Sequence, residues 1–157
     1  MTNCKRNYNA SINLTVDEQL FSTKARCKFT QYMPSKPGKF GIKFWILSDA
    51  VHPYVLNARP YLGAHFEEDR QSMQLGQFVV MDLMKPFYNR GHNVTVDNFF
   101  TSKMLCESLK KQKTTLVGTV RGNRKELPRE FTDLKRPLNS VLQGYHSGLK
   151  TVSFFQA

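Results

Sequence analysis

The chain has 157 residues, which is enough for one domain with a hydrophobic core and too few for two. Hydrophobic residues make up 40% and aromatic residues 12% of the sequence, a composition that excludes a disordered tail. Lys and Arg outnumber Asp and Glu by 23 to 12, and the net charge of +11 is explained equally well by a polyanionic partner and by a basic protein without one.

The sequence contains no membrane span and no secretory signal. No uninterrupted apolar run is longer than the four residues 44–47 or 78–81, whereas a span needs about 20 residues. The three cysteines, Cys4, Cys27 and Cys106, are far apart and lack a CxxC spacing. We therefore expect reduced thiols in a cytosolic or nuclear protein, with neither structural zinc nor a disulfide framework.

Three antiparallel strands are predicted in the first third of the chain. Residues 1–10 are polar and unpatterned, which indicates a flexible lead-in. Apolar and polar residues then alternate from Ile12 to Asp17, as in a half-buried strand. A second extended segment, Cys27–Met33, is followed by a turn that contains two prolines and a glycine. The third strand, Phe40–Ser48, has apolar residues on both faces, which is typical of the middle of a sheet.

The middle of the chain is less clearly patterned until a helix begins. Residues 54–62 are compatible with another extended piece, and the charged residues 67–72 indicate a solvated loop. From Leu75 to Phe87 apolar residues recur every four positions, which predicts a helix that Pro86 kinks or ends.

A strand, a helix and a further strand are predicted next. The first of these strands is His92–Asp97. The helix is capped by Thr101 or Ser102, and lysines in its last turn complement the helix dipole. The last strand of the unit is Thr114–Arg121. Beyond it, a basic loop with prolines leads to a short hairpin near Val141 to Phe155.

The fold predicted from this order is an α/β mixed sheet, with three antiparallel strands followed by helix, strand, helix and strand. A right-handed crossover makes the last two strands parallel. Two strands share one pattern, N-L-T-V-D at 13–17 and N-V-T-V-D at 93–97. A single Asp near a strand end is more often a turn former or helix cap than a ligand. Asp17 and Asp97 together, on neighbouring strands, would instead form a site for a hard divalent cation.

Five strings stand in order over roughly residues 11 to 130, namely 14–20, 26–43, 61–63, 94–102 and 116–128. Together they resemble the catalytic domain of the piggyBac family of DNA transposases. The resemblance implies a ribonuclease-H-like fold, in which three aspartates hold two divalent ions during cut-and-paste DNA transposition. It assigns Asp17 and Asp97 as the first two of these ligands. Mg²⁺ suits the site because it keeps several waters and accepts phosphate oxygens beside one or two carboxylates.

The same resemblance predicts what residues 11–157 lack. The family's third aspartate lies on a later helix, and no segment before Ala157 matches it. We therefore expect a catalytic domain that is incomplete at its C-terminal end and inactive as this chain alone. The family's N-terminal DNA-binding portion and its cysteine-rich zinc module are also unmatched. One further departure is that Ala25 stands where the family usually has Gly, which matters if φ is positive there.

Basic residues beside the predicted site are candidate contacts to DNA phosphates, although solvated loops explain each of them singly as well. They are Lys36, Lys39, Lys43, Arg121, Arg124 and Lys125. The resemblance further implies double-stranded DNA as the partner, no membrane, a nuclear location, and a homodimer formed through segments that this sequence lacks.

Two other functions stay open on the sequence alone. A domesticated module would keep the fold and bind DNA or protein without chemistry. A nonfunctional fragment of a decayed element would show poor solubility or an exposed apolar sheet edge.

Overall fold

The computed structural model describes residues 4, 7–63, 73–132, 140–146 and 150–156. They form two units, Met1–Val120 and Arg121–Ala157. The predicted solvated loop at 67–72 lies outside the described residues. None of the described helices is long and apolar enough to cross a membrane.

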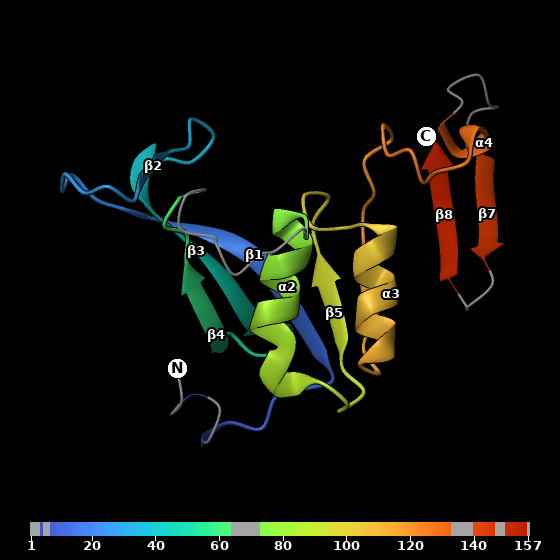
Figure 1. Ribbon diagram of the computed structural model, residues 1–157, viewed down its shortest axis with the longest axis horizontal. Helices are drawn as coiled ribbons and strands as arrows, with labels where there is room; N and C mark the ends of the chain where they lie inside the picture. Colours follow the sequence, from blue (N-terminus) through green and yellow to red (C-terminus); the bar gives the residue numbers. More distant parts are fainter. Residues whose placement is uncertain (1–3, 5–6, 64–72, 133–139, 147–149, 157) are drawn as a thin grey trace. The chain divides into compact units, whose positions relative to one another are not determined.

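The first unit is built on a mixed sheet, whose strands are β1 (Asn13–Ser22), β2 (Thr30–Tyr32), β3 (Phe40–Asp49), β4 (Val55–Pro60), β5 (Asn93–Val96) and β6 (Thr115–Gly118). The central strand β1 pairs antiparallel with β3 on one side and parallel with β5 on the other (Figure 1). β6 continues the sheet beyond β5 in parallel, while β2 and β4 both pair antiparallel with β3. The predicted mixed sheet is confirmed, and the extended piece at 54–62 is β4.

β1 is longer than predicted, because it ends at Ser22 and not at Asp17. The polar run that begins at Asp17 resembles a strand end, but pairing with β3 carries the strand on as far as Ser22↔Gly41. Pairing with β5 stops earlier, at Val16↔Val96. The sheet therefore has a step beside Asp17, where the β5 side of β1 pairs with no other described strand.

Two other predicted strands are shorter in the structure. β2 covers only Thr30–Tyr32 of the predicted Cys27–Met33, because the backbone turns just before it and only three residues align with β3. β6 ends at Gly118, short of the predicted Arg121, because its partner β5 ends opposite that glycine.

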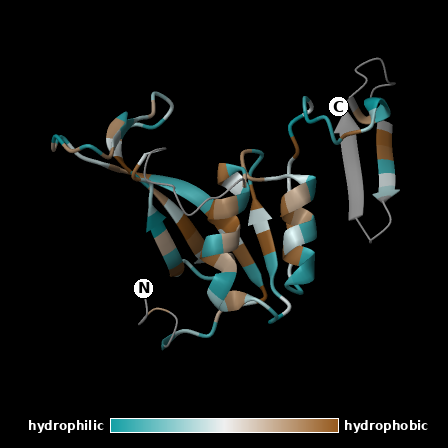
Figure 2. Cartoon of the chain, viewed as in Figure 1, coloured by the Kyte–Doolittle hydropathy of each residue, from teal (hydrophilic) through white to brown (hydrophobic). Residues whose placement is uncertain are grey.

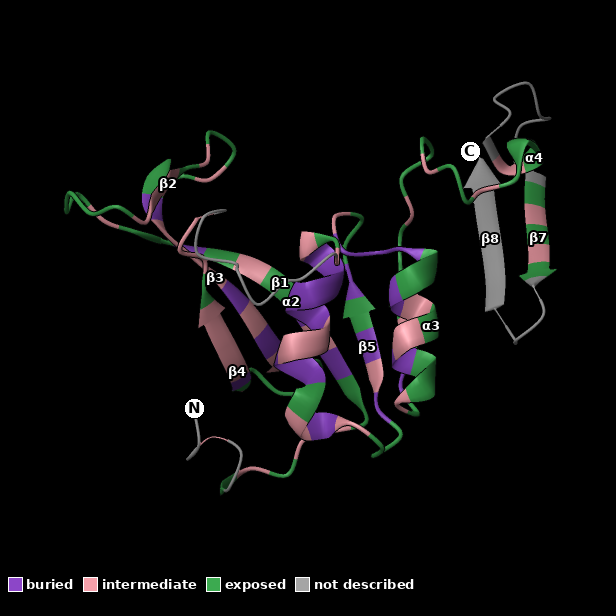
Figure 3. Ribbon diagram, in the orientation of Figure 1, coloured by how far each residue is buried: buried purple, intermediate pink, exposed green. Residues whose placement is uncertain are grey.

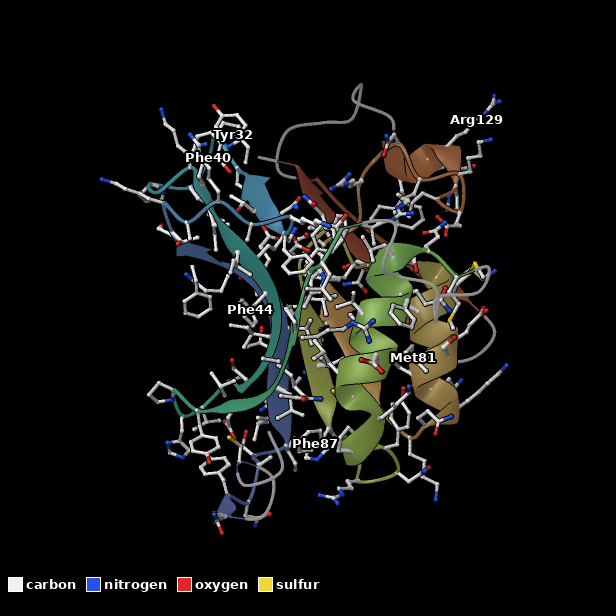
Figure 4. The ribbon with its side chains drawn as sticks, turned by 60° about the vertical axis from the view of Figure 1, so that its left-hand side comes forward. Tyr32, Phe40, Phe44, Met81, Phe87 and Arg129 are labelled. Carbon is white, nitrogen blue, oxygen red and sulfur yellow. The ribbon has the colours of Figure 1, made fainter. Side chains whose placement is uncertain are left out.

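Two helices and a short 3-10 turn cover one face of this sheet (Figures 1 and 4). Helix α2, Leu75–Met84, continues into the 3-10 turn η3, Lys85–Phe87, where Pro86 removes a backbone donor and ends the α-helix as predicted. Helix α3, Lys103–Lys111, begins after Ser102, whose hydroxyl accepts a hydrogen bond from a backbone N–H of the first turn. Of the two predicted caps, Ser102 is the one used.

The core lies between these helices and the sheet (Figures 2 and 3). Alternate residues of the strands supply one side of it: Leu14, Val16, Trp45, Leu47, Val94 and Val96. The helices supply the other side with Val79, Val80, Leu83, Leu105 and Leu109. Because strand side chains alternate between faces, the intervening residues of β1 and β5 lie on the opposite face of the sheet.

The residues just before β1 are held against the end of β3. The Tyr8 ring stacks on Tyr54 with centroids 4.1 Å apart, and its hydroxyl donates to Asp49 Oδ2 at 3.2 Å. Ser11 donates to the same carboxylate through its backbone N–H (2.7 Å) and its hydroxyl (2.8 Å), and two amides of the following turn donate as well. Burial alone would raise the pKa of Asp49, but these hydrogen bonds outweigh it and lower the pKa. The described end of the predicted lead-in thus has a fixed anchor.

The second unit contains α4 (Arg129–Thr132) and the antiparallel pair β7 (Ser140–His146) and β8 (Lys150–Gln156). This pair confirms the hairpin predicted near Val141 to Phe155. The ring of Phe131 lies against Gly144, where a larger residue would collide with it.

Candidate metal centre

The parallel register of β1 and β5 places Asp17 beside Asp97. The last paired residues of the two strands are Val16 and Val96, and each aspartate is the next residue of its chain segment. Neighbouring strands lie about 4.8 Å apart, and residues in register on them point to the same face. Both aspartates are exposed. The strands predicted to be neighbours are neighbours, and they present two adjacent carboxylates.

The Asp17 side chain lies on the face of the sheet that α2 and α3 leave uncovered. Asp17 is opposite Ile46 in the β1–β3 register, and Ile46 shares a face with Phe44 two residues earlier. Phe44 points away from the helices (Figure 4). Val16 and Val96, which precede the two aspartates, are buried on the other side. The core therefore fixes the direction of the Asp17 side chain, whereas Asp97 follows the end of β5 and is directed by the turn after the strand.

Each carboxylate also accepts a local backbone hydrogen bond. Asp17 Oδ1 accepts from the N–H of Glu18 at 2.7 Å. Asp97 Oδ1 accepts from the N–H of Phe99 at 2.9 Å, and the Asp97 carbonyl accepts from the Thr101 hydroxyl at 2.7 Å. Asp97 therefore forms the turn expected of an Asp at a strand end, and this turn orients the carboxylate.

Lys43 is built into the neighbourhood of the two aspartates. Its side chain is only 16% exposed, with Nζ 3.8 Å from Glu18 Oε2 and 3.8 Å from the centroid of the Trp45 ring. Burial lowers the pKa of Lys43, as does the charge of Lys36, while the carboxylates of Glu18, Asp97 and Asp17 act in the opposite direction. Glu18 and Trp45 face each other across β1 and β3, which is why the ammonium meets both.

The aromatic side chains beside Lys43 link it to the turn that carries Asp97. The Trp45 ring stacks on Phe99 with centroids 5.6 Å apart, and Phe100 meets Trp45 edge-on at 5.5 Å. Trp45 and Phe100 are each 1% exposed, as expected for core residues. Sequence reasoning missed the Lys43–Glu18 pair, because only the register of two strands brings these residues together.

The other predicted phosphate-binding residues are distributed over both units. Lys36 Nζ lies 3.8 Å from Glu18 Oε1, and Lys39 is exposed in the turn before β3 with φ 50°. Arg121, Arg124 and Lys125 belong to the second unit, where the N–H of Arg124 donates to the carbonyl of Arg121 in a turn. Their contact with DNA phosphates stays a prediction.

A basic hollow that the sequence did not predict lies beyond the end of β1. The hollow has a volume of about 1140 Å³ and is lined by residues that include Lys24, Arg26 and Lys28. Ala25, also in its lining, is not among the described residues with positive φ. The alanine that replaces the family's glycine therefore causes no backbone strain.

Comparison with known proteins shows the family to which the chain belongs. The family model described as Transposase IS4, DDE_Tnp_1_7, matches residues 1–156. The chain is also similar to a piggyBac transposase, whose cryo-EM structure is a synaptic complex with hairpin DNA, with a TM-score of 0.86 and 36% identity over 92% of this chain. The chain belongs to the piggyBac-type transposases. It spans 30% of the length of the piggyBac chain that it matches.

The similarity shows that this transposase chain has the ribonuclease-H-like α/β fold predicted from its sequence. Transposases of the DDE family generally use a divalent metal ion. Among the described residues there is no group of three or more Asp, Glu, His or Cys side chains that could hold a metal ion. Two adjacent, exposed carboxylates still fit Mg²⁺, because that ion takes one or two protein carboxylates and completes its shell with water and phosphate oxygens.

Proposed function

We propose that this transposase chain contributes Asp17 and Asp97 to a metal-dependent centre that processes phosphodiester bonds of double-stranded DNA during cut-and-paste transposition. The observation that carries the proposal is the β1–β5 register, in which the two aspartates directly follow the last paired residues of adjacent strands. Two adjacent carboxylates, unlike the side chains of a solvated loop, can hold an oxygen-loving divalent ion between them.

The chain's own residues would bind and orient the reactants. Asp17 and Asp97 would hold the ions, and the turn at Phe99 would keep the Asp97 carboxylate in place through its backbone hydrogen bond. The ions, Mg²⁺ by preference, would activate water or a DNA 3′-hydroxyl and stabilise the leaving oxygen.

Duplex DNA as the partner is supported by charge and by the similar structure. The net charge is +11, and Lys24, Arg26, Lys28 and Lys39 are exposed beyond the end of β1 and in the neighbouring turn. Basic side chains of this kind contact DNA phosphates and release counterions. The matching piggyBac structure is a complex with hairpin DNA. We extend the proposal to a nuclear location, where such a partner would be met.

A second function, DNA binding without cleavage, is favoured by one specific observation. The described residues bring together two carboxylates and no third ligand. Two carboxylates do not hold both ions in the family's arrangement, so we expect residues 1–157 alone to bind DNA and not to cleave it.

The test combines duplex binding and plasmid nicking by the purified chain. We expect salt-dependent binding of a labelled duplex, no robust Mg²⁺-dependent nicking, and Mn²⁺ binding that is lost in Asp17→Asn and Asp97→Asn but kept in the exposed control Glu126→Gln. Absence of duplex binding at low salt would refute the DNA partner. Nicking that Asp17→Ala abolishes would refute the inactivity of the chain alone.

A further inference from the structure

Asp97 differs from Asp17 in how its carboxylate is held. Asp17 belongs to a paired strand, whereas Asp97 directly follows β5 and depends on the turn after it. In this turn Asp97 Oδ1 accepts from the N–H of Phe99 at 2.9 Å and from the N–H of Phe100 at 3.4 Å. Within the described part of the chain, no hydrogen bond reaches Asp97 Oδ2. The turn therefore occupies one carboxylate oxygen and leaves the other for a ligand.

The Phe99 ring ties this turn to the core. It stacks on the Trp45 ring with centroids 5.6 Å apart and planes 13° apart, and it meets the Phe100 ring edge-on at 5.0 Å. Phe100 also lies edge-on to Trp45 at 5.5 Å, so each of the three rings contacts the other two. Trp45 and Phe100 are each 1% exposed, and close packing around them provides a rigid base. The ring cluster thus fixes the two residues whose N–H groups hold Asp97.

Two glycines let neighbouring elements close on the same turn. A β-carbon at Gly76, in the first turn of α2, would lie only 3.0 Å from the Phe99 carbonyl oxygen. A β-carbon at Gly118, the last residue of β6, would collide with the Thr101 hydroxyl. That hydroxyl donates to the Asp97 carbonyl at 2.7 Å. Because glycine has no side chain, α2 and β6 can both pack tightly against the turn.

We infer that Phe99 is a positioning residue for the metal centre. Its stack on Trp45 keeps the turn closed, which commits Asp97 Oδ1 to backbone amides and presents Oδ2 to the ion. The inference rests on the proposed function, in which Asp97 is a metal ligand. In an opened turn the carboxylate would stand on a mobile segment, which ion binding would first have to order. Ordering the backbone of one residue weakens binding about five- to thirtyfold.

The experiment uses the full 157-residue chain and three variants. Phe99→Leu removes the ring and keeps an apolar side chain, whereas Phe99→Tyr keeps the ring. Phe87→Leu is the matched control, because Phe87 is 3% exposed in the same core and follows the opposite end of α2 from Gly76. Circular dichroism during urea unfolding verifies that each variant is folded and measures its stability. If Phe99→Leu does not fold, Phe99→Met takes its place, because the flexible methionine fills the space without a ring.

Two quantities are measured for each protein. The first is Mn²⁺ affinity without DNA, from the electron paramagnetic resonance signal of free Mn²⁺. The second is the rate of hydrogen exchange at the N–H of residue 99, from nuclear magnetic resonance, which reports how often the turn opens. We expect Phe99→Leu to bind Mn²⁺ about five- to thirtyfold more weakly than the wild type and to exchange this hydrogen faster. Phe99→Tyr should match the wild type, and so should Phe87→Leu, although its loss of core packing lowers stability.

The outcomes separate this inference from the proposed function. Mn²⁺ binding that depends on Asp97 but keeps its wild-type affinity in the folded ring-free variant would overturn the role of Phe99 alone. Unchanged hydrogen exchange at residue 99 in that variant would do the same. Equal weakening of Mn²⁺ binding in Phe87→Leu would also overturn it, because a general loss of core stability would then explain the effect. Absence of Mn²⁺ binding that depends on Asp97 in the wild type would refute the metal ligand itself, and the inference with it.

Discussion

Replacement of Asp49 by Asn is expected to lower the free energy of unfolding at neutral pH by about 3 kcal/mol. One carboxylate oxygen, Oδ2, accepts from the Ser11 N–H and the Tyr8 hydroxyl, and the other accepts from Ser11 Oγ and two turn amides. An asparagine has only one acceptor oxygen, so the donors at one position lose their partner. Hydrogen bonds to a charged acceptor contribute about 1.5–3 kcal/mol each, and losing two of them, with partial rearrangement, gives this figure.

The same substitution should change how stability depends on pH. Because folding lowers the pKa of Asp49, its contribution is complete above the ordinary Asp pKa of about 3.9 and is lost as the pH falls through the lower folded value. The amide of the Asp49→Asn variant does not titrate, so the difference between the two proteins should shrink between about pH 5 and pH 2.

Urea unfolding followed by Trp45 emission measures both effects, since the chain has a single tryptophan. Tyr8→Phe is the control, because it keeps the stack on Tyr54 and removes only one donor, and it should cost less than Asp49→Asn. A loss below about 1 kcal/mol at pH 7, or a loss of equal size at pH 3, would show that the hydrogen bonds to Asp49 do not hold the start of β1 as argued.

Two further predictions concern the ends of α3. Ser102→Ala removes the hydroxyl that accepts from Leu105 N, and urea unfolding should show a loss of about 1 kcal/mol; no loss would mean that water replaces the cap. Lys113 has φ 53°, a conformation that glycine adopts freely, so Lys113→Gly should raise the unfolding free energy by about 0.5–1 kcal/mol. Lys111→Gly, within the helix, should instead lower it by about 1 kcal/mol, and the same sign for both would contradict the assignment.

The sequence predicted the parts of the fold that depend on local periodicity. The repeated five-residue pattern at 13–17 and 93–97 correctly indicated two neighbouring strands, because alternation reveals which face each residue takes. The predicted end of β1 at Asp17 was wrong because the prediction relied on the same alternation. After Asp17 the alternation is broken by Glu18 and Gln19, and only hydrogen bonds to a partner strand about 20 or more residues away maintain the strand.

The surroundings of Lys43 could not be predicted from the sequence at all. In the sequence Lys43 is one basic residue after a turn, like Lys39, and both were predicted to bind phosphate. The structure separates them, because Lys39 is exposed in the turn while the register of β1 and β3 brings Lys43 to Glu18 and Trp45. Such a difference depends on pairing between distant segments, which leaves no local signal.

The step in the sheet, where β5 ends at Val96 while β1 continues to Ser22, leaves one side of β1 beyond Asp17 without a partner among the described strands. Both aspartates beside this step are exposed. Under the proposed function, a backbone phosphate of the duplex would reach the two carboxylates along this unpaired stretch of β1.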